Sequence, residues 1–194
     1  MADIESFETA IKQRDTAAAL KLAQETPSLL REKLSGGLTP LTLAAYNGAW
    51  ELVRAFTELS GINTIGDAVL SGDLELVTTM LDGQPELLTT LTVDGFTLLH
   101  LAAYFGKDAI ALDLISRGAD VNAYSSNELH NKPLHAALAG QASDDVIESL
   151  LKHGAAVTSE GATPLQIAAQ NGRDKAVALL IAHGADQSSL ATPS

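Results

Sequence analysis

One motif recurs along the chain and constrains its fold more than any other feature. Residues 38–48 read LTPLTLAAYNG, and copies follow at 96–106 (FTLLHLAAYFG), 132–140 (KPLHAALAG) and 162–172 (ATPLQIAAQNG). Two degenerate copies, ETAIKQRD and GDAVLSGD, occur at 8–15 and 66–73. Self-similarity at a period of about 20–50 residues indicates supersecondary units that bury their apolar faces by stacking on one another. The sequence therefore predicts a repeat protein.

The residue that closes each copy is glycine in five of the six copies. The closing positions are Arg14, Gly48, Gly72, Gly106, Gly140 and Gly172, at intervals of 34, 24, 34, 34 and 32 residues. Residues 4–48 also match residues 62–106 at a constant offset of 58, which indicates a duplicated two-repeat unit. The short interval falls at the junction near residues 59–61, where we expect no room for a full hairpin between repeats.

Each copy predicts a helix, a turn, a second helix and a loop. In ATPLQIAAQNG, Thr163 can cap a helix and Pro164 suits the first helical position. The paired alanines of the motif allow a second helix to approach, and the closing glycine allows a positive φ. In the second helix at 108–116, Ile110 and Leu114 are spaced for one helical face.

These motifs, together with exits such as GADVN at 118–122, resemble the ankyrin repeat over about residues 4–190. The resemblance implies an all-α fold, a curved solenoid of stacked antiparallel helix pairs with short hairpin or loop fingers. We expect one domain over residues 1–190 and a short tail at 191–194. The expected repeats, two of them degenerate, span approximately 4–34, 35–61, 62–92, 93–124, 125–159 and 160–190.

Several positions depart from the ankyrin pattern. Leu98 replaces the usual proline in repeat four, and Lys132 replaces the usual threonine at the start of repeat five. Repeat five also has two extra residues between Gly140 and Gly154, and two more in the loop at 124–131. Repeats one and three end in ETPSLL and DGQPELL, so we expect their fingers to differ in shape.

The chain is acidic, with 24 Asp and Glu against 12 Lys and Arg and a net charge of −12. This balance disfavours nucleic acid and anionic membranes, and it favours a partner protein with a basic and partly apolar surface, although acidity also serves solubility. The absence of cysteine excludes disulfides and thiolate chemistry. The first residues lack the features of a signal peptide, and no stretch approaches the length of a membrane span, so we expect a soluble, cytoplasmic protein.

The histidines are predicted to be structural. The position of His100 is filled in the other copies by threonine, histidine or glutamine, which share hydrogen-bonding capacity, so we expect a polar tie to neighbouring backbone. His153 and His183 precede helix-ending glycines, where they complement the helix dipole. His130 and His135 alone are a weak zinc signal, because a third ligand is missing. We therefore predict no metal site.

No pattern indicates catalysis. The chain lacks G-x-S-x-G, P-loop and dinucleotide-binding motifs. The paired carboxylates Asp144 and Asp145 open a helix, where acidic residues are common. We predict that the protein is not an enzyme and has no catalytic residue or cofactor.

Aromatic residues occupy positions that the motif leaves variable. Five of them lie just before a closing glycine, before the helix start, or on a finger: Tyr46, Phe96, Tyr104, Phe105 and Tyr124. Exposed aromatics are typical anchors of interfaces, so we predict that these five bind a partner through the concave face and fingers. The alternative is that some pack against a neighbouring finger, Phe96 above all. Trp50 stands where the family has a leucine, and we expect it in the core.

The sequence predicts a non-catalytic protein–protein interaction module or adaptor. The alternative is a structural repeat protein that self-associates end to end. The last helix, DKAVALLIAHG at 174–184, is mostly apolar, so a weak homodimer through the C-terminal repeat is the form this alternative would take.

Overall fold

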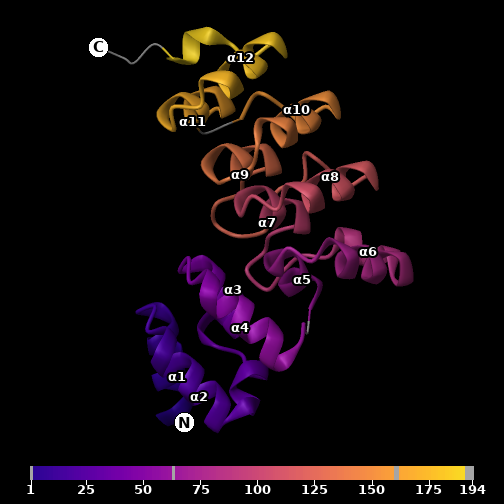
Figure 1. Ribbon diagram of the computed structural model, residues 1–194. Coiled ribbons are helices and arrows are strands. Elements are labelled where there is room, and N and C mark those ends of the chain that lie inside the picture. The colour runs from indigo at the N-terminus through magenta and orange to yellow at the C-terminus, as the bar shows by residue number, and fades with distance from the viewer. Residues whose placement is uncertain (1, 63, 160–161, 191–194) are drawn as a thin grey trace. The chain divides into compact units, whose positions relative to one another are not determined.

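The computed structural model describes residues 2–62, 64–159 and 162–190 (Figure 1). Within these residues there are twelve α-helices and four short 3-10 segments, and no strand. An isolated antiparallel bridge joins Leu91 and Thr97. The predicted all-α class is confirmed. The expected tail at 191–194 lies outside the described residues.

The α-helices form six consecutive pairs, one within each expected repeat. The pairs in the first half are α1 (Ala2–Lys12) with α2 (Thr16–Glu25), α3 (Pro40–Tyr46) with α4 (Trp50–Ser60), and α5 (Ile65–Ser71) with α6 (Leu74–Gly83). The remaining pairs are α7 (Leu98–Tyr104) with α8 (Asp108–Ser116), α9 (Pro133–Ala139) with α10 (Asp144–Lys152), and α11 (Pro164–Gln170) with α12 (Asp174–Ala182). The 3-10 segments are η1 (Pro27–Arg31), η2 (Ser35–Gly37), η3 (Pro85–Thr89) and η4 (Gln187–Leu190). As predicted, the connection from α4 to α5 is short.

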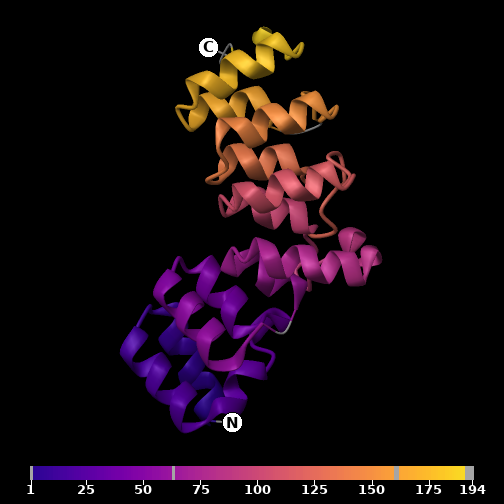
Figure 2. The ribbon, with the colours of Figure 1, turned by 45° about the vertical axis from the view of Figure 1, so that its right-hand side comes forward.

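The chain divides into two compact units of three helix pairs each. Unit 1 comprises residues 1–87 and 92–94, and unit 2 comprises residues 88–91 and 95–194. In unit 1, α3 packs on α1 and α5, and α2 packs on α4. In unit 2, α7, α9 and α11 form one row, and α8, α10 and α12 form a second (Figure 1). Figure 2 shows from another direction that the pairs of unit 2 stack in chain order. That all six repeats form one domain stays a prediction.

Threonine starts the first helix in four of the repeats. Each of the four accepts a hydrogen bond from the backbone N–H three residues on, and they cap α3, α5, α7 and α11: Thr39, Thr64, Thr97 and Thr163. The cap predicted for Thr163 is thereby confirmed. Helix α9 differs, because Lys132 at its N-cap makes no side-chain cap hydrogen bond.

The closing residue has a positive φ in five of the six copies. Arg14 follows the glycines in this respect, with φ of +57°, so even the degenerate first copy keeps the backbone geometry of the motif. Gly140 was expected to do the same, and this prediction is wrong, because its φ is −101°. Helix α9 is displaced by 35 residues from α7, so Gln141 takes the place of Gly106. Gly140 is required for another reason: a Cβ there would lie 2.2 Å from the carbonyl oxygen of Tyr104.

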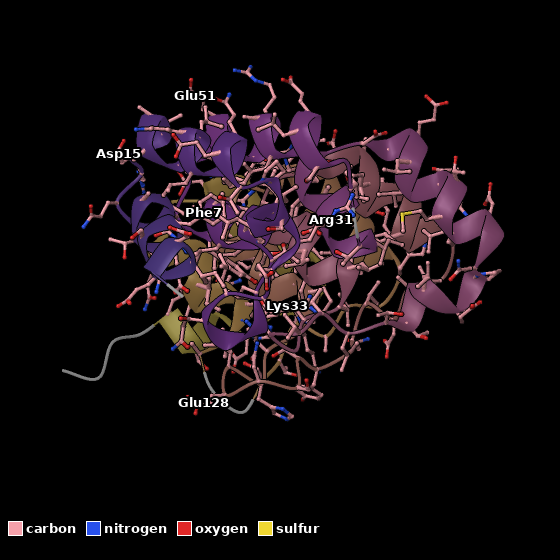
Figure 3. All side chains as sticks on the ribbon, turned by 90° about the horizontal axis from the view of Figure 1, so that it is seen from below. Phe7, Asp15, Arg31, Lys33, Glu51 and Glu128 are labelled. Atoms are coloured by element: carbon pink, nitrogen blue, oxygen red, sulfur yellow. The ribbon has the colours of Figure 1, made fainter. Side chains whose placement is uncertain are left out.

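Each unit has its own apolar core. In unit 1, Phe7 and Phe56 are buried with their ring centroids 5.6 Å apart, and Figure 3 places Phe7 among the helices. In unit 2, the leucines and isoleucines of α7 to α10 are buried, except Leu112 of α8, which is exposed. The paired alanines of the motif are buried except Ala169, which agrees with the predicted close approach of the second helix.

Trp50 corrects one core prediction. Its side chain is 37% exposed at the first residue of α4, whereas Leu52, Val53 and Phe56 supply the buried face of this helix. The first residue of a helix lies at the edge of the packed face, so a large ring there is only partly covered. The prediction that Trp50 lies in the core is wrong. No described helix is long and apolar enough to cross a membrane.

Candidate functional site

The five aromatic residues predicted to bind a partner differ in exposure. The tyrosines are exposed, with 45% of Tyr104 and 48% of Tyr124 accessible, and Tyr46 is also exposed. Phe96 is half-buried, with its ring centroid 5.7 Å from that of His100. Tyr46 belongs to unit 1, and the other four belong to unit 2. Partner binding by the tyrosines stays a prediction.

Phe105 does not offer the exposed surface that was predicted for it. Its side chain is only 7% exposed, and its ring meets the edge of Tyr104 at a centroid distance of 5.0 Å and an interplanar angle of 89°. Phe105 is the C-cap residue of α7, where the chain turns toward α8, and the turn directs its ring inward. The residue therefore stabilises unit 2, and its expected role as a surface anchor is wrong.

Tyr46 connects α3 to the segment that follows η3. Its hydroxyl donates a hydrogen bond to the carboxylate of Asp94, which also accepts one from the Thr92 hydroxyl at 2.5 Å. The ring is exposed, but its hydroxyl is engaged within unit 1. Tyr46 can contribute an apolar face to a partner while holding residues 92–94 in place.

One hollow of the described surface is a groove in unit 2, with a volume of about 360 Å³. It lies against the loop at 124–132, helix α9 and the start of α11. The residues that line it are Tyr124, Leu129, His130, Asn131, Lys132, His135, Ala139, Ser159, Ala162 and Ile167. We call this feature the finger groove, and the loop at 124–132 the finger loop. Of the five aromatics predicted to bind, Tyr124 lines it.

Hydrogen bonds within the finger loop fix its shape. The N–H of Ser125 donates to the carbonyl oxygen of Asn131 at 2.8 Å, and the N–H of Asn131 donates to the Ser125 hydroxyl at 3.1 Å. The side chain of Asn127 accepts from the N–H of Leu129 at 3.1 Å. The N–H of Ser126 donates to Gly95 at 2.8 Å, which attaches the loop to the preceding repeat. The two extra residues of this loop are thus accommodated in an ordered turn.

His100 holds the finger loop from α7. Its Nε2–H donates to the carbonyl oxygen of Asn131 at 3.0 Å, and its Nδ1 accepts from the Thr97 hydroxyl at 2.8 Å. Burial lowers the pKa of His100 to about 4, so the ring is neutral near pH 7. The predicted structural tie to neighbouring backbone is confirmed. His153 and His183 likewise bond to carbonyl oxygens four residues back, at the ends of α10 and α12.

Aromatic, cationic and apolar side chains form the rim of the groove. The rings of Tyr124 and His130 are stacked, with centroids 4.3 Å apart and an interplanar angle of 6°. The ammonium of Lys132 lies 4.9 Å from the centroid of the Tyr124 ring. Leu129 is 67% exposed beside them. A rim with an exposed leucine and tyrosine offers the apolar contact that interface anchors provide.

His135 occupies the same motif position as His100 but lacks its hydroxyl partner. It is 8% exposed, and its Nδ1 has no hydrogen-bond partner among the described residues. The reason is Lys132, which stands where Thr97 stands in the preceding repeat and has no hydroxyl to donate. Burial lowers the pKa of His135, and the charge of Lys132 acts in the same direction. The Oδ1 atom of Asn131 is a second buried acceptor with no described donor.

The charge of Lys132 is not matched by a described carboxylate. Elsewhere in unit 2, Lys152 pairs with Glu148 at 2.7 Å, and Arg117 pairs with Asp113 at 2.7 Å. Among the described residues that line the finger groove, none is acidic. Glu128, in the same loop, is exposed, and Figure 3 shows it outside the helices. The described lining of the groove thus combines polar and apolar side chains with the cation of Lys132, on an acidic chain.

The side chains that line the finger groove suit the binding of a ligand better than catalysis. His130 and His135 both line the groove, but the described residues contain no group of three His, Cys, Asp or Glu side chains placed to hold a metal ion. The sequence prediction missed the groove as a site, although two of its signals were visible. The extra residues at 124–131 and the lysine in place of threonine at 132 both build it.

Comparisons with known proteins agree with the repeat pattern. A family model described as ankyrin repeats in three copies matches residues 65–154 and 114–190. The Neurogenic locus Notch protein of Drosophila melanogaster is 34% identical over 156 residues, which are 77% of this chain and 5% of that protein. NF-kappa-B inhibitor alpha of Gallus gallus is 38% identical over 99 residues, 48% of this chain and 30% of that protein.

A yeast relative adds a third comparison. The Target of rapamycin complex 2 subunit AVO2 of Saccharomyces cerevisiae is 30% identical over 125 residues, 62% of this chain and 29% of that protein. In each of these three cases the match spans less than a third of the relative's length.

Proposed function

Because the chain belongs to the ankyrin-repeat family, we propose that it is a non-catalytic module that binds a partner protein through the finger groove of unit 2. Ankyrin repeats generally mediate protein–protein interaction. The names of two relatives, NF-kappa-B inhibitor alpha and Target of rapamycin complex 2 subunit AVO2, describe an inhibitor of another factor and a subunit of a complex. Repeat arrays use one scaffold for many partners, so the site carries the specificity.

The finger groove is the observation that carries this proposal. Its volume of about 360 Å³ falls within the range of sites that enclose a ligand group. Tyr124 and Leu129 are exposed on its rim, and the loop that presents them is already ordered by its own hydrogen bonds. An ordered loop loses little conformational entropy on binding, which favours affinity.

The partner is proposed to have a surface that is basic overall and partly apolar. Between Arg54 and Lys107 the chain contains seven acidic residues and no Lys or Arg. Carboxylates of this kind steer the encounter with a basic surface, whereas apolar anchors supply affinity. Tyr46 and Tyr104 are proposed as additional contacts, and Phe105 is not. The same charge balance disfavours nucleic acid and anionic membranes. A cytoplasmic location stays a prediction.

Quantitative affinity capture tests the groove. The double variant Tyr124→Ala with Leu129→Ala removes both exposed rim side chains, and Leu112→Ala removes an exposed leucine of α8 outside the groove. We expect the rim variant to recover at least about tenfold less of a partner than the native chain does, because truncating central anchors typically costs more than 1 kcal/mol each. Mass spectrometry of captured proteins gives the ratio.

The Leu112→Ala chain is the control and should capture the partner at native strength. Circular dichroism melting of both variants should resemble that of the native protein, since surface substitutions usually change stability little. Equal recovery of every captured protein by the rim variant would show that binding does not depend on the groove.

Self-association through the last repeat is the weaker alternative. Helix α12 exposes Ala178 and Ala182, whereas Val177, Leu179 and Ile181 are half-buried. None of the large apolar side chains of this helix is among the exposed ones. An end-to-end contact there would have little apolar surface to bury.

A further inference from the structure

Lys132 breaks the pattern of its own motif at two points. The threonines at this position in four other repeats cap the following helix, and Lys132 leaves α9 without a side-chain cap. In repeat four the threonine also donates its hydroxyl to the buried histidine, and in repeat five His135 Nδ1 has no described donor. Positions that break local rules without a compensating contact are most often functional. Lys132 is therefore a candidate recognition residue.

The position of the Lys132 side chain supports such a role. Its ammonium lies over the ring of Tyr124 at the groove and has no described carboxylate within ion-pair distance. The residue is half-buried, so its charge is screened less than that of a fully exposed lysine. None of the described residues that line the groove is acidic. An unpaired, partly desolvated cation attracts an anion strongly.

We infer that the finger groove binds a peptide segment of the partner that presents a carboxylate next to an apolar side chain. The carboxylate, from Asp, Glu or a chain terminus, pairs with Lys132. This inference rests on the proposed function and specifies what enters the groove. The rest of the partner's surface can still be basic, because it faces the acidic residues outside the groove.

A peptide also matches the other features of the groove. Ala139 and Ile167 offer an apolar wall for the neighbouring side chain. The single unpaired cation matches one carboxylate, whereas a phosphate group carries close to two negative charges at pH 7.

Selection from a phage-displayed library of random 12-residue peptides tests the inference. The baits are the native chain and the variants Lys132→Thr and Lys132→Met. Lys132→Thr rebuilds the helix cap and the hydroxyl partner of His135, so we expect it to melt at a higher temperature than the native chain. Any loss of binding by this variant then cannot result from poor folding.

We expect the native chain to select peptides enriched in Asp or Glu beside an apolar residue. In the best synthetic peptide, replacing the acidic residue by its amide should weaken binding about tenfold, and so should Lys132→Thr or Lys132→Met. Combining the amide peptide with either variant should add little further loss, because both changes remove the same interaction.

The outcomes separate the inference from the proposed function. Selected peptides that are neutral or basic, or that bind Lys132→Thr at native strength, overturn the carboxylate inference. If those peptides still lose affinity for Tyr124→Ala with Leu129→Ala, the groove remains the binding site. If no peptide is selected, or the selected peptides ignore both sets of variants, the groove function fails together with the inference.

Discussion

His100 and His135 have the same place in their repeats but different environments. The Thr97 hydroxyl and the Asn131 carbonyl satisfy both ring nitrogens of His100. In His135 the substitution of threonine by Lys132 leaves Nδ1 without a described partner. The first arrangement is structural and holds the finger loop. In the second arrangement, His135 Nδ1 lacks the hydrogen bond from a threonine, and Lys132 places its ammonium at the groove.

His100 makes stability depend on pH. Its pKa is about 4 in the folded state against an ordinary value of 6.5, because burial disfavours the charged ring. The unfolded chain therefore binds a proton more readily than the folded chain does. The contribution of the neutral ring is fully present above about pH 6.5 and is lost as the pH falls toward 4.

The variant His100→Gln removes this titration, and glutamine already fills the same position in repeat six. We expect the free energy of unfolding of the native chain to fall by about 1 kcal/mol more per pH unit than that of the variant between pH 6.5 and 4.5. Urea titrations at several pH values measure the difference. His153→Gln, at an exposed helix end, should follow the native curve, and parallel curves for all three chains would contradict the prediction.

At the scale of elements, the backbone of α7 and α9 is held in close contact by a glycine. A Cβ at Gly140 would lie 2.2 Å from the Tyr104 carbonyl oxygen, and the N–H of Gln141 donates to the same oxygen at 2.9 Å. The clash is with backbone, which cannot move without separating the two helices. The spacing of α7 and α9 therefore depends on this position.

Gly140→Ala is expected to lower the free energy of unfolding by more than about 3 kcal/mol, because it forces two packed helices apart. Gly83→Ala is the matched control. Gly83 is the last residue of α6, has no positive φ and has open space around its Cα, so alanine there should be neutral or stabilising by up to about 1 kcal/mol. Urea denaturation measures both. Equal effects of the two substitutions would show that the contact at Gly140 can relax.

The sequence predicted the elements better than the orientation of single side chains. Threonine caps and alanine pairs are set by local chemistry, so repetition of the motif identified six helix pairs. The orientation of Phe105 depends on how the chain leaves α7, and the exposure of Trp50 depends on its place at the edge of α4. Neither follows from the repeat period. Gly140 was assigned to the closing position only because it is a glycine. The structure places Gln141 at that position, because α9 begins 35 residues after α7.

The finger groove was harder to predict because its residues come from separate repeats. Tyr124 was identified as a candidate, but its stacking on His130 requires the ordered finger loop. Lys132 and His135 are three residues apart. Their role is visible only once the structure shows that Lys132 has no hydroxyl to donate to His135 Nδ1. Ile167 is contributed by α11, more than thirty residues away. A departure from the motif was visible at Lys132, but its consequence required the three-dimensional structure.

At the scale of the whole molecule, the chain presents two units with different features. Unit 1 has the exposed Tyr46, tied by its hydroxyl to Asp94, and much of the long acidic stretch that lacks Lys and Arg. Unit 2 has the finger groove, with its unpaired lysine and exposed rim. Both units are helix pairs stacked in the manner of the ankyrin-repeat family. We expect binding to be centred on unit 2.

Hydrogen–deuterium exchange of the native chain with and without a captured partner tests this claim most directly. The account predicts slower exchange on binding in the finger loop at 124–132 and at the ends of α9 and α11 that line the groove. Helices α2 and α4 of unit 1 should exchange at unchanged rates. Protection confined to unit 1, with no change in the finger loop, would contradict the assignment of the groove as the binding site.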